Sequence, residues 1–192
     1  MKEYAKILKA AFDPFFESPL DDWMGFAELC KVERKKKNSI LKKAHSAEHF
    51  MYFIISGSAG VFLWKEQNQV CLDIAYENHF FCDMMSMLSG QVTPLETMVL
   101  EDAELLVMPQ EKYKALGNTA EGLILTRIAA ESSFMHKQQQ QIDLLTKTNE
   151  ERYIDFLVMF PGIVNRVSQK HIASYLGITP QSFSRLKKKS RI

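Results

Sequence analysis

The spacing of apolar residues changes along the chain, and it predicts N-terminal helices followed by a region of strands. Residues 1–30 have a helical spacing that is interrupted at Pro14 and Pro19, and proline disrupts a helix interior. From Ser39 to about Met108 the apolar runs are short and rich in Phe, Tyr, Ile and Val, with turn residues roughly every 8–12 positions. This pattern predicts an all-β sandwich or barrel. Its most distinct strands are expected at residues 51–55, 60–64, 70–76, 96–100 and 104–108.

Helical spacing returns after the strands, first at residues 110–116 and then in a long segment from about Thr119 to Thr146. The long segment repeats apolar residues at intervals of three and four, at Ile124, Ile128, Met135, Ile142 and Leu145. This face either packs on the chain's own β region or meets a second copy as a two-helix seam. We favour the second copy, because the pattern is long and residues 138–141 are wholly polar, although two polar positions on the seam weaken it.

The segment Val167–Lys188 has the spacing of a helix-turn-helix, and it follows a predicted helix at residues 150–160. Gly177 is the expected turn residue, since glycine adopts positive φ without strain. Counted from this turn, apolar residues fall where two crossing helices bury side chains, at Ile172, Leu176, Ile178, Phe183 and Leu186, with the small Ala173 at the close approach. Ser168 and Thr179 are suited to be N-caps, and Pro180 to be a first helical residue. The alternative is an ordinary αα-hairpin.

The distribution of charge favours the helix-turn-helix. From Phe156 onward the chain has seven Lys or Arg residues and no Asp or Glu, which leaves 17 basic and 23 acidic residues before that point. A basic C-terminal segment on an acidic body is the pattern of a phosphate-binding module. An earlier basic cluster, residues 34–37, is expected to be a solvated loop or strand edge, with nucleic-acid contact as the less favoured alternative.

The order of these elements resembles the Crp/Fnr family of bacterial transcription regulators over nearly the whole chain. The likeness is carried by Met51–Leu63, which resembles the family's hairpin, by His79–Asp83 at the start of the phosphate-binding cassette, and by Val167–Leu186. The resemblance implies an α+β fold with an N-terminal β-roll (a double-stranded β-helix or jelly roll) of roughly eight strands. It also implies a long dimerisation helix, a homodimer, and a second helix of the motif that reads the major groove of DNA.

The cassette departs from the pattern of family members that bind cyclic nucleotides. Cys82-Asp83 replaces Gly-Glu, although Asp83 could still accept from a hydroxyl, and Leu95-Glu96 replaces the Arg-Ser pair that grips the phosphate. A carboxylate facing a phosphodiester in a partly buried pocket is unfavourable by several kcal/mol. We therefore expect no response to cAMP. A candidate effector pocket is drawn from these positions: Phe81, Cys82, Asp83, Met84, Leu95, Glu96 and Thr97.

The start of the second helix supplies the expected readers of DNA bases. Gln181, Ser182 and Arg185 are expected on the outward face of this helix, while Phe183 and Leu186 point inward. Arg185 could therefore read guanine and Gln181 adenine. Phosphate contacts are expected from Ser168, Lys170, Thr179, Lys187 and Lys188. Because the sequence ends at Ile192, we expect no β-hairpin wing after this helix and phosphate contacts from helices alone.

Other classes of protein fit less well. Three scattered cysteines suggest no disulfide framework, zinc ribbon or four-cysteine iron–sulfur site, so no cofactor or metal is expected. His45-Ser-Ala-Glu-His49 matches an inverted zinc-peptidase motif but precedes a strand instead of lying on a helix. No apolar run is long enough to span a membrane, and the N-terminus does not resemble a secretory signal, so a cytoplasmic protein is expected.

The sequence therefore predicts three parts: a sensor domain at residues 1–117, a dimerisation helix at 118–148 and a helix-turn-helix domain at 149–192. The predicted function is a homodimeric regulator that binds double-stranded DNA. An alternative is a β-roll module that binds a non-nucleotide effector of unidentified chemistry and thereby controls DNA binding. An enzyme with a β-roll active site is the least favoured alternative, since it predicts a pocket with convergent polar groups and the cassette residues are mainly apolar.

Overall fold

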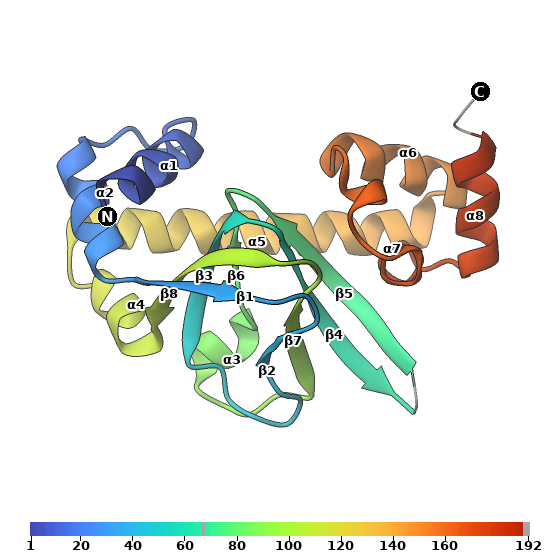
Figure 1. The fold of residues 1–192 in the computed structure, drawn as a ribbon, viewed down its shortest axis with the longest axis horizontal. Helices are drawn as coiled ribbons and strands as arrows, with labels where there is room; N and C mark the ends of the chain where they lie inside the picture. The colour runs from blue at the N-terminus through green and yellow to red at the C-terminus, as the bar shows by residue number, and fades with distance from the viewer. Residues whose placement is uncertain (67, 190–192) are drawn as a thin grey trace.

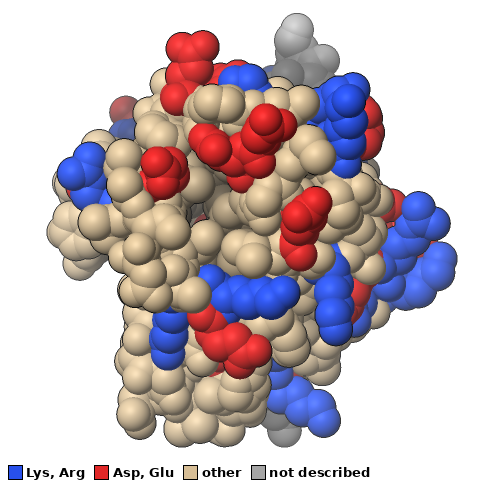
Figure 2. Space-filling view, turned by 90° about the vertical axis from the view of Figure 1, so that its left-hand side faces the viewer, with Lys and Arg blue, Asp and Glu red and all other residues tan. Residues whose placement is uncertain are grey.

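Two short helices begin the chain and lie at one end of the molecule. The computed structural model describes residues 1–66 and 68–189. Helix α1 (Lys2–Phe12) and helix α2 (Leu20–Glu28) are separated by the expected break at the prolines. Phe12 and Trp23 stack between them with ring centroids 5.3 Å apart. Figure 2 views this end of the molecule and shows acidic side chains over its upper part.

The β region consists of two four-stranded antiparallel sheets, in the orders β1-β8-β3-β6 and β2-β7-β4-β5. The strands are β1 (Lys31–Lys35), β2 (Ile40–Lys42), β3 (Phe50–Ser56), β4 (Ser58–Lys65), β5 (Asn68–Tyr76), β6 (Phe80–Phe81), β7 (Leu95–Val99) and β8 (Ala103–Pro109). The short helix α3 (Met84–Ser89) lies between β6 and β7. The β-roll is confirmed, as are all five strands expected from the spacing of apolar residues.

The early basic cluster belongs to an edge strand and its turn. Strand β1 pairs only with β8, so it forms one edge of its sheet. Arg34 pairs with Glu104 at 2.9 Å, and Lys36 pairs with Asp102 at 2.8 Å. These ion pairs join β1 to the start of β8, which supports the strand-edge interpretation of the cluster.

The long helix runs along the molecule from the N-terminal helices to the C-terminal ones (Figure 1). Helix α4 (Gln110–Leu116) leads into α5 (Ala120–Thr146), whose 27 residues span about 40 Å. Within α5 only Gly122 is buried. Met135 and Leu145 on the predicted seam are 70% and 78% exposed. The seam therefore does not pack on the chain's own β region at these positions, and its contact with a second copy stays a prediction.

The C-terminal helices share a hydrophobic core with one sheet. They are α6 (Asn149–Met159), a 3-10 turn at Ile163–Asn165, α7 (Gln169–Tyr175) and α8 (Pro180–Lys189). Their buried residues pack with residues of β4, β5 and β7, including Phe62, Cys71 and Met98. The sheet thus carries one core on each face, and the C-terminal helices sit on the chain's own β-roll.

Candidate nucleic-acid interface and sensor cassette

Helices α7 and α8 form the predicted helix-turn-helix. Gly177 has φ +66 and the Ile178 N–H donates to the Ala173 carbonyl at 2.9 Å, which turns the chain sharply between the helices. Ala173 and Phe183 are fully buried at the crossing. The Phe183 ring also meets Tyr153 of α6 edge-on, with centroids 5.5 Å apart. The two helices are therefore fixed to each other and to α6 by the residues that their spacing indicated.

Both predicted N-caps are present. The Ser168 hydroxyl accepts from the His171 N–H at 3.3 Å, and the Thr179 hydroxyl accepts from the Ser182 N–H at 3.1 Å. Helix α8 begins at Pro180, as expected. Helix starts carry unpaired N–H groups and partial positive charge. The first turns of α7 and α8 are exposed. Their N–H groups and partial positive charge would favour the phosphate of a nucleic acid.

The outward face of α8 is polar and basic. Gln181, Arg185 and Lys188 recur at intervals of four and three and are all exposed, so they form one row along the helix. Ser182 is half-buried beside Thr179, its hydroxyl accepting from the Thr179 hydroxyl at 3.0 Å. This row brings together two of the three residues expected to read bases, Gln181 and Arg185, and one of those expected to contact phosphates, Lys188.

The remaining predicted phosphate contacts flank this row. Lys170 is exposed in the first turn of α7. Lys187 is half-buried, and its Nζ donates to the Val164 carbonyl at 3.3 Å. Lys187 thus also ties α8 to the preceding loop, a structural role that sequence reasoning missed.

An arginine clamps the helix-turn-helix to the β-roll. Arg166, just before α7, pairs with Glu77 after β5 and with Glu101 before β8. Burial raises the pKa of Glu77, but hydrogen bonds from Arg166 and from the Gly57 N–H outweigh burial and hold the pKa below its usual value. The Ser174 hydroxyl of α7 accepts from the Cys71 N–H of β5 at 2.8 Å. These contacts fix the orientation of α7 on the sheet, and none of them was expected from the sequence.

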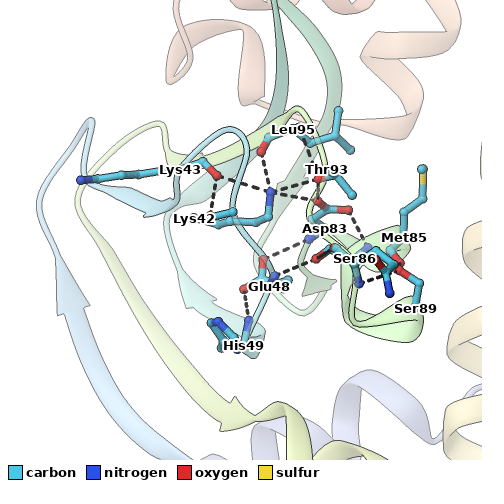
Figure 3. A network of polar contacts seen from close by, with 12 residues as sticks. Lys42, Lys43, Glu48, His49, Asp83, Met85, Ser86, Ser89, Thr93 and Leu95 are labelled. Atoms are coloured by element: carbon cyan, nitrogen blue, oxygen red, sulfur yellow. Dashed lines mark hydrogen bonds and ion pairs between the residues drawn. The ribbon is translucent and has the colours of Figure 1, made fainter.

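The residues at the cassette position form a closed polar network (Figure 3). Asp83 caps α3, and its carboxylate accepts from the Ser86 N–H at 3.1 Å. The same carboxylate pairs with Lys42 Nζ at 3.1 Å and accepts from the Thr93 hydroxyl. Lys42 also donates to the Thr93 hydroxyl at 3.0 Å and to the Leu95 carbonyl at 2.6 Å. The side chains of Lys42 and Asp83 are 1% and 0% exposed, so this ion pair is sealed from solvent.

A second buried carboxylate completes the network. Glu48 accepts from the backbone N–H groups of His49, Phe50 and Asp83, at 3.1 to 3.2 Å. Its own N–H donates to the Ser86 hydroxyl at 2.8 Å. Burial raises the pKa of Glu48, and the three N–H donors and the Lys42 ammonium oppose that rise. Backbone donors therefore hold Glu48 in place. Among the described carboxylates, the ion pair of Lys42 is with Asp83.

The candidate effector residues divide between this network and the core. Phe81, Cys82 and Thr97 are buried, while Met84 and Leu95 are half-buried. Burial raises the pKa of the Cys82 thiol well above its usual value, which makes it unreactive. Glu96 is buried and accepts from the Gln69 amide at 2.9 Å. Of the candidate residues, Asp83 and Leu95 share polar partners, which are Lys42 and the Thr93 hydroxyl.

The hydrogen-bond donors at the cassette position are already engaged by a carboxylate of the chain. A phosphodiester needs a cation or an array of N–H donors that is free to receive it. In this cassette Lys42 and the Ser86 N–H already serve the Asp83 carboxylate. The hydroxyl from which Asp83 accepts in this structure is that of Thr93. The Asp83 carboxylate accepts from the donors that a ligand's phosphate would need, which are Lys42 and the Ser86 N–H. A phosphate bound here would therefore compete with Asp83 for these donors.

Sequence reasoning missed Lys42, Glu48, Ser86 and Thr93. One signal was available: Lys42 directly follows the apolar pair Ile40-Leu41 and belongs to the same short strand. Among the described residues no group of three or more His, Cys, Asp and Glu side chains is arranged to hold a metal ion. None of the described helices combines the length and apolar character that crossing a membrane requires.

Comparison with known proteins matches the β-roll to a known domain family. Residues 31–119 match the cyclic nucleotide-binding domain family. No curated protein sequence matches the chain.

Solved structures resemble the chain over most of its length. FixK2 from Bradyrhizobium japonicum is 16% identical, with a TM-score of 0.73 over 83% of each chain. A CooA mutant from Carboxydothermus hydrogenoformans is 18% identical, with a TM-score of 0.66 over 96% of this chain and 84% of that one. A protein from Eubacterium rectale, described as a transcriptional regulator of the Crp/Fnr family, is 14% identical, with a TM-score of 0.68 over 91% and 84%. At these identities the likeness is one of fold.

Proposed function

We propose that this chain, which joins a cyclic nucleotide-binding domain to the fold of Crp/Fnr-type regulators, is a sequence-specific DNA-binding transcription regulator that acts as a homodimer in the cytoplasm. The observation that carries the proposal is the exposed row of Gln181, Arg185 and Lys188 on α8. No acidic residue occurs from Phe156 onward to repel a phosphate. The role is regulatory and not catalytic.

In this proposal α8 enters the major groove of DNA. The helix has ten residues and is about 15 Å long, which suits the groove's width of about 12 Å. Arg185 donates two hydrogen bonds to guanine, and Gln181 pairs with adenine. Phosphate contacts from Ser168, Lys170, Thr179, Lys187 and Lys188 set the register of the helix in the groove.

Two copies of α5 form the dimer seam. The side chains of Met135, Ile142 and Leu145 lie on one face of α5, and at least half of each is left exposed by the described residues. A two-fold dimer places two α8 helices on one side of DNA, about 34 Å or one helical turn apart. The proposal therefore includes a palindromic operator.

The proposal also holds that DNA binding needs no cyclic nucleotide, because Asp83 already engages Lys42 and the Ser86 N–H. A regulator with a different effector is a second candidate. A cavity away from the cassette, between α2 and the junction of α4 with α5, favours it.

A pair of substitutions tests the proposed roles on α8. Arg185→Ala is expected to weaken binding to the preferred sequence by about 1–3 kcal/mol and to relax one base position. Lys188→Ala, the matched control on the same row, is expected to weaken preferred and random duplexes alike, by a phosphate contact. Fluorescence anisotropy with both duplexes at fixed salt measures the difference. Equal losses on both duplexes from Arg185→Ala would contradict its role as a base reader.

A further inference from the structure

The early basic cluster contains one lysine that the β-roll does not neutralise. Among residues 34–37, the first three each form an ion pair with a carboxylate of the roll. Lys37 is exposed, and among the described residues no carboxylate forms an ion pair with it. An exposed lysine is ordinary by itself, so its surroundings decide whether it has a function.

The turn that carries Lys37 is anchored to the loop before β8. The Lys37 N–H donates to the Asp102 carboxylate at 2.9 Å, and the Asn38 N–H donates to the Val99 carbonyl at 3.0 Å. Asn38 has φ +66, a conformation that asparagine adopts more readily than most residues. These backbone contacts set the point at which the Lys37 side chain leaves the roll.

The same loop contacts the segment that leads into α7. Asp102 is next to Glu101, whose carboxylate pairs with Arg166 at 2.8 Å. Arg166 lies two positions before Ser168, the N-cap of α7. Strand β1 itself runs from the N-terminal helices toward the C-terminal ones (Figure 1). The turn that carries Lys37 and the start of the helix-turn-helix are therefore attached to one loop of the roll.

A second observation places the charge of Lys37 near the first turn of α7. His171 is half-buried, and its ring meets Phe62 of β4 edge-on, with centroids 4.9 Å apart. Burial lowers the pKa of His171, and the positive charges of Lys170 and Lys37 lower it further. Lys170 in the helix-turn-helix and Lys37 in the β-roll thus act on the same group at the start of α7.

These two lysines keep their charge available to an anion from outside the chain. The carboxylates of the loop and of the clamp, Glu77, Glu101 and Asp102, each form an ion pair with another cation. No ion pair among the described residues includes Lys37 or Lys170. Both are exposed, so a phosphate can approach either one without breaking an ion pair.

We propose that Lys37 contacts a DNA phosphate beside the site that α8 reads, so that the β-roll extends the DNA-binding surface of the helix-turn-helix. The inference rests on the proposed function, because it takes the DNA to lie on α7 and α8. Duplex DNA carries one negative charge per about 1.7 Å of its axis, so a lysine beside a bound duplex meets phosphates whatever the sequence. Lys37 therefore adds affinity and orientation but no base preference.

The test measures the binding of preferred and random duplexes by fluorescence anisotropy over a range of salt concentrations. Lys37→Ala removes one phosphate contact from each half of a dimer, so the slope of log affinity against log salt is expected to flatten by about 1.8. Between about 50 and 200 mM salt, the wild type should therefore lose about tenfold more affinity than Lys37→Ala. Lys37→Arg keeps the charge and is expected to keep the slope. Lys31→Ala, exposed at the other end of β1, is the matched control and should bind as the wild type does.

Single methylphosphonates, each of which removes the charge of one phosphate, locate the contact on the preferred duplex. We expect a position where this change weakens the wild type several-fold and leaves Lys37→Ala unaffected. An unchanged salt slope for Lys37→Ala, or an unchanged methylphosphonate pattern, would overturn the inference and leave the proposed function standing. A wild-type chain that binds no duplex would contradict both. A flattened slope on random duplex without any preferred sequence would support the Lys37 contact and contradict base reading by α8.

Discussion

The buried pair of Lys42 and Asp83 gives the most quantitative prediction. Lys42→Met keeps most of the side-chain volume but removes the ammonium, which leaves the Asp83 carboxylate sealed from solvent without a cation. At an effective dielectric constant of about 20, unit charges 3.1 Å apart attract by about 5 kcal/mol. Breaking a buried pair by removing one partner costs about 3–5 kcal/mol. We expect the free energy of unfolding to fall by that amount.

The double variant Lys42→Met/Asp83→Asn separates the pair from simple loss of packing. The asparagine side chain carries no charge, and its amide oxygen can still accept from the Ser86 N–H. Replacing both members of a buried ion pair by uncharged groups is often neutral or stabilising. The double variant is therefore expected to recover most of the stability that Lys42→Met loses.

Urea unfolding at pH 7, followed by circular dichroism, measures these changes. Lys43→Met is the matched control, since the neighbouring Lys43 is exposed and its loss is expected to change stability by less than about 0.5 kcal/mol. An ordinary neutral hydrogen bond contributes about 1 kcal/mol to stability. The reasoning is refuted if Lys42→Met lowers the free energy of unfolding by less than about this amount. It is also refuted if the double variant is no more stable than Lys42→Met.

Three further predictions concern the dimer, the clamp and the turn. Leu145 lies on the α5 seam and is 78% exposed in a single chain, so Leu145→Glu would place a charge in the dimer contact. We expect this variant to sediment as a monomer at micromolar concentration, and an unchanged dimer would contradict the seam. Because the pKa of Glu77 is lowered beside Arg166, the stability it adds is present above its ordinary pKa of 4.5 and is lost as pH falls through the lowered value. Urea midpoints between about pH 5 and 3 should thus fall more steeply for the wild type than for Glu77→Gln, and parallel slopes would argue against the clamp. Gly177→Ala, at φ +66, is expected to cost about 1–3 kcal/mol in unfolding experiments, whereas Gly117→Ala, at φ −62, should cost little; equal effects would remove the turn argument.

The helix-turn-helix could be predicted from sequence because its determinants are local. Gly177, Ala173 and Phe183 lie within eleven positions of one another, and their spacing alone fixes how two helices cross. The strands and the long helix were predictable for the same reason, since their apolar spacing is a property of neighbouring residues.

The polar network and the clamp depend on residues that are distant in sequence. Lys42 meets Thr93 from 51 positions away, and Arg166 meets Glu77 from 89 positions away. Such pairs leave no periodic pattern in a single sequence. The sequence did indicate that Glu96 was unsuited to face a phosphate, but only the fold shows that Asp83 is paired with Lys42.

The central claim is that α8 reads DNA as part of a dimer, and selection of bound sequences from a random DNA pool tests it most directly. The account predicts enrichment of a palindrome whose half-sites are about one helical turn apart, obtained without added cyclic nucleotide. Recovery of no preferred sequence, or of a single half-site without symmetry, would contradict it.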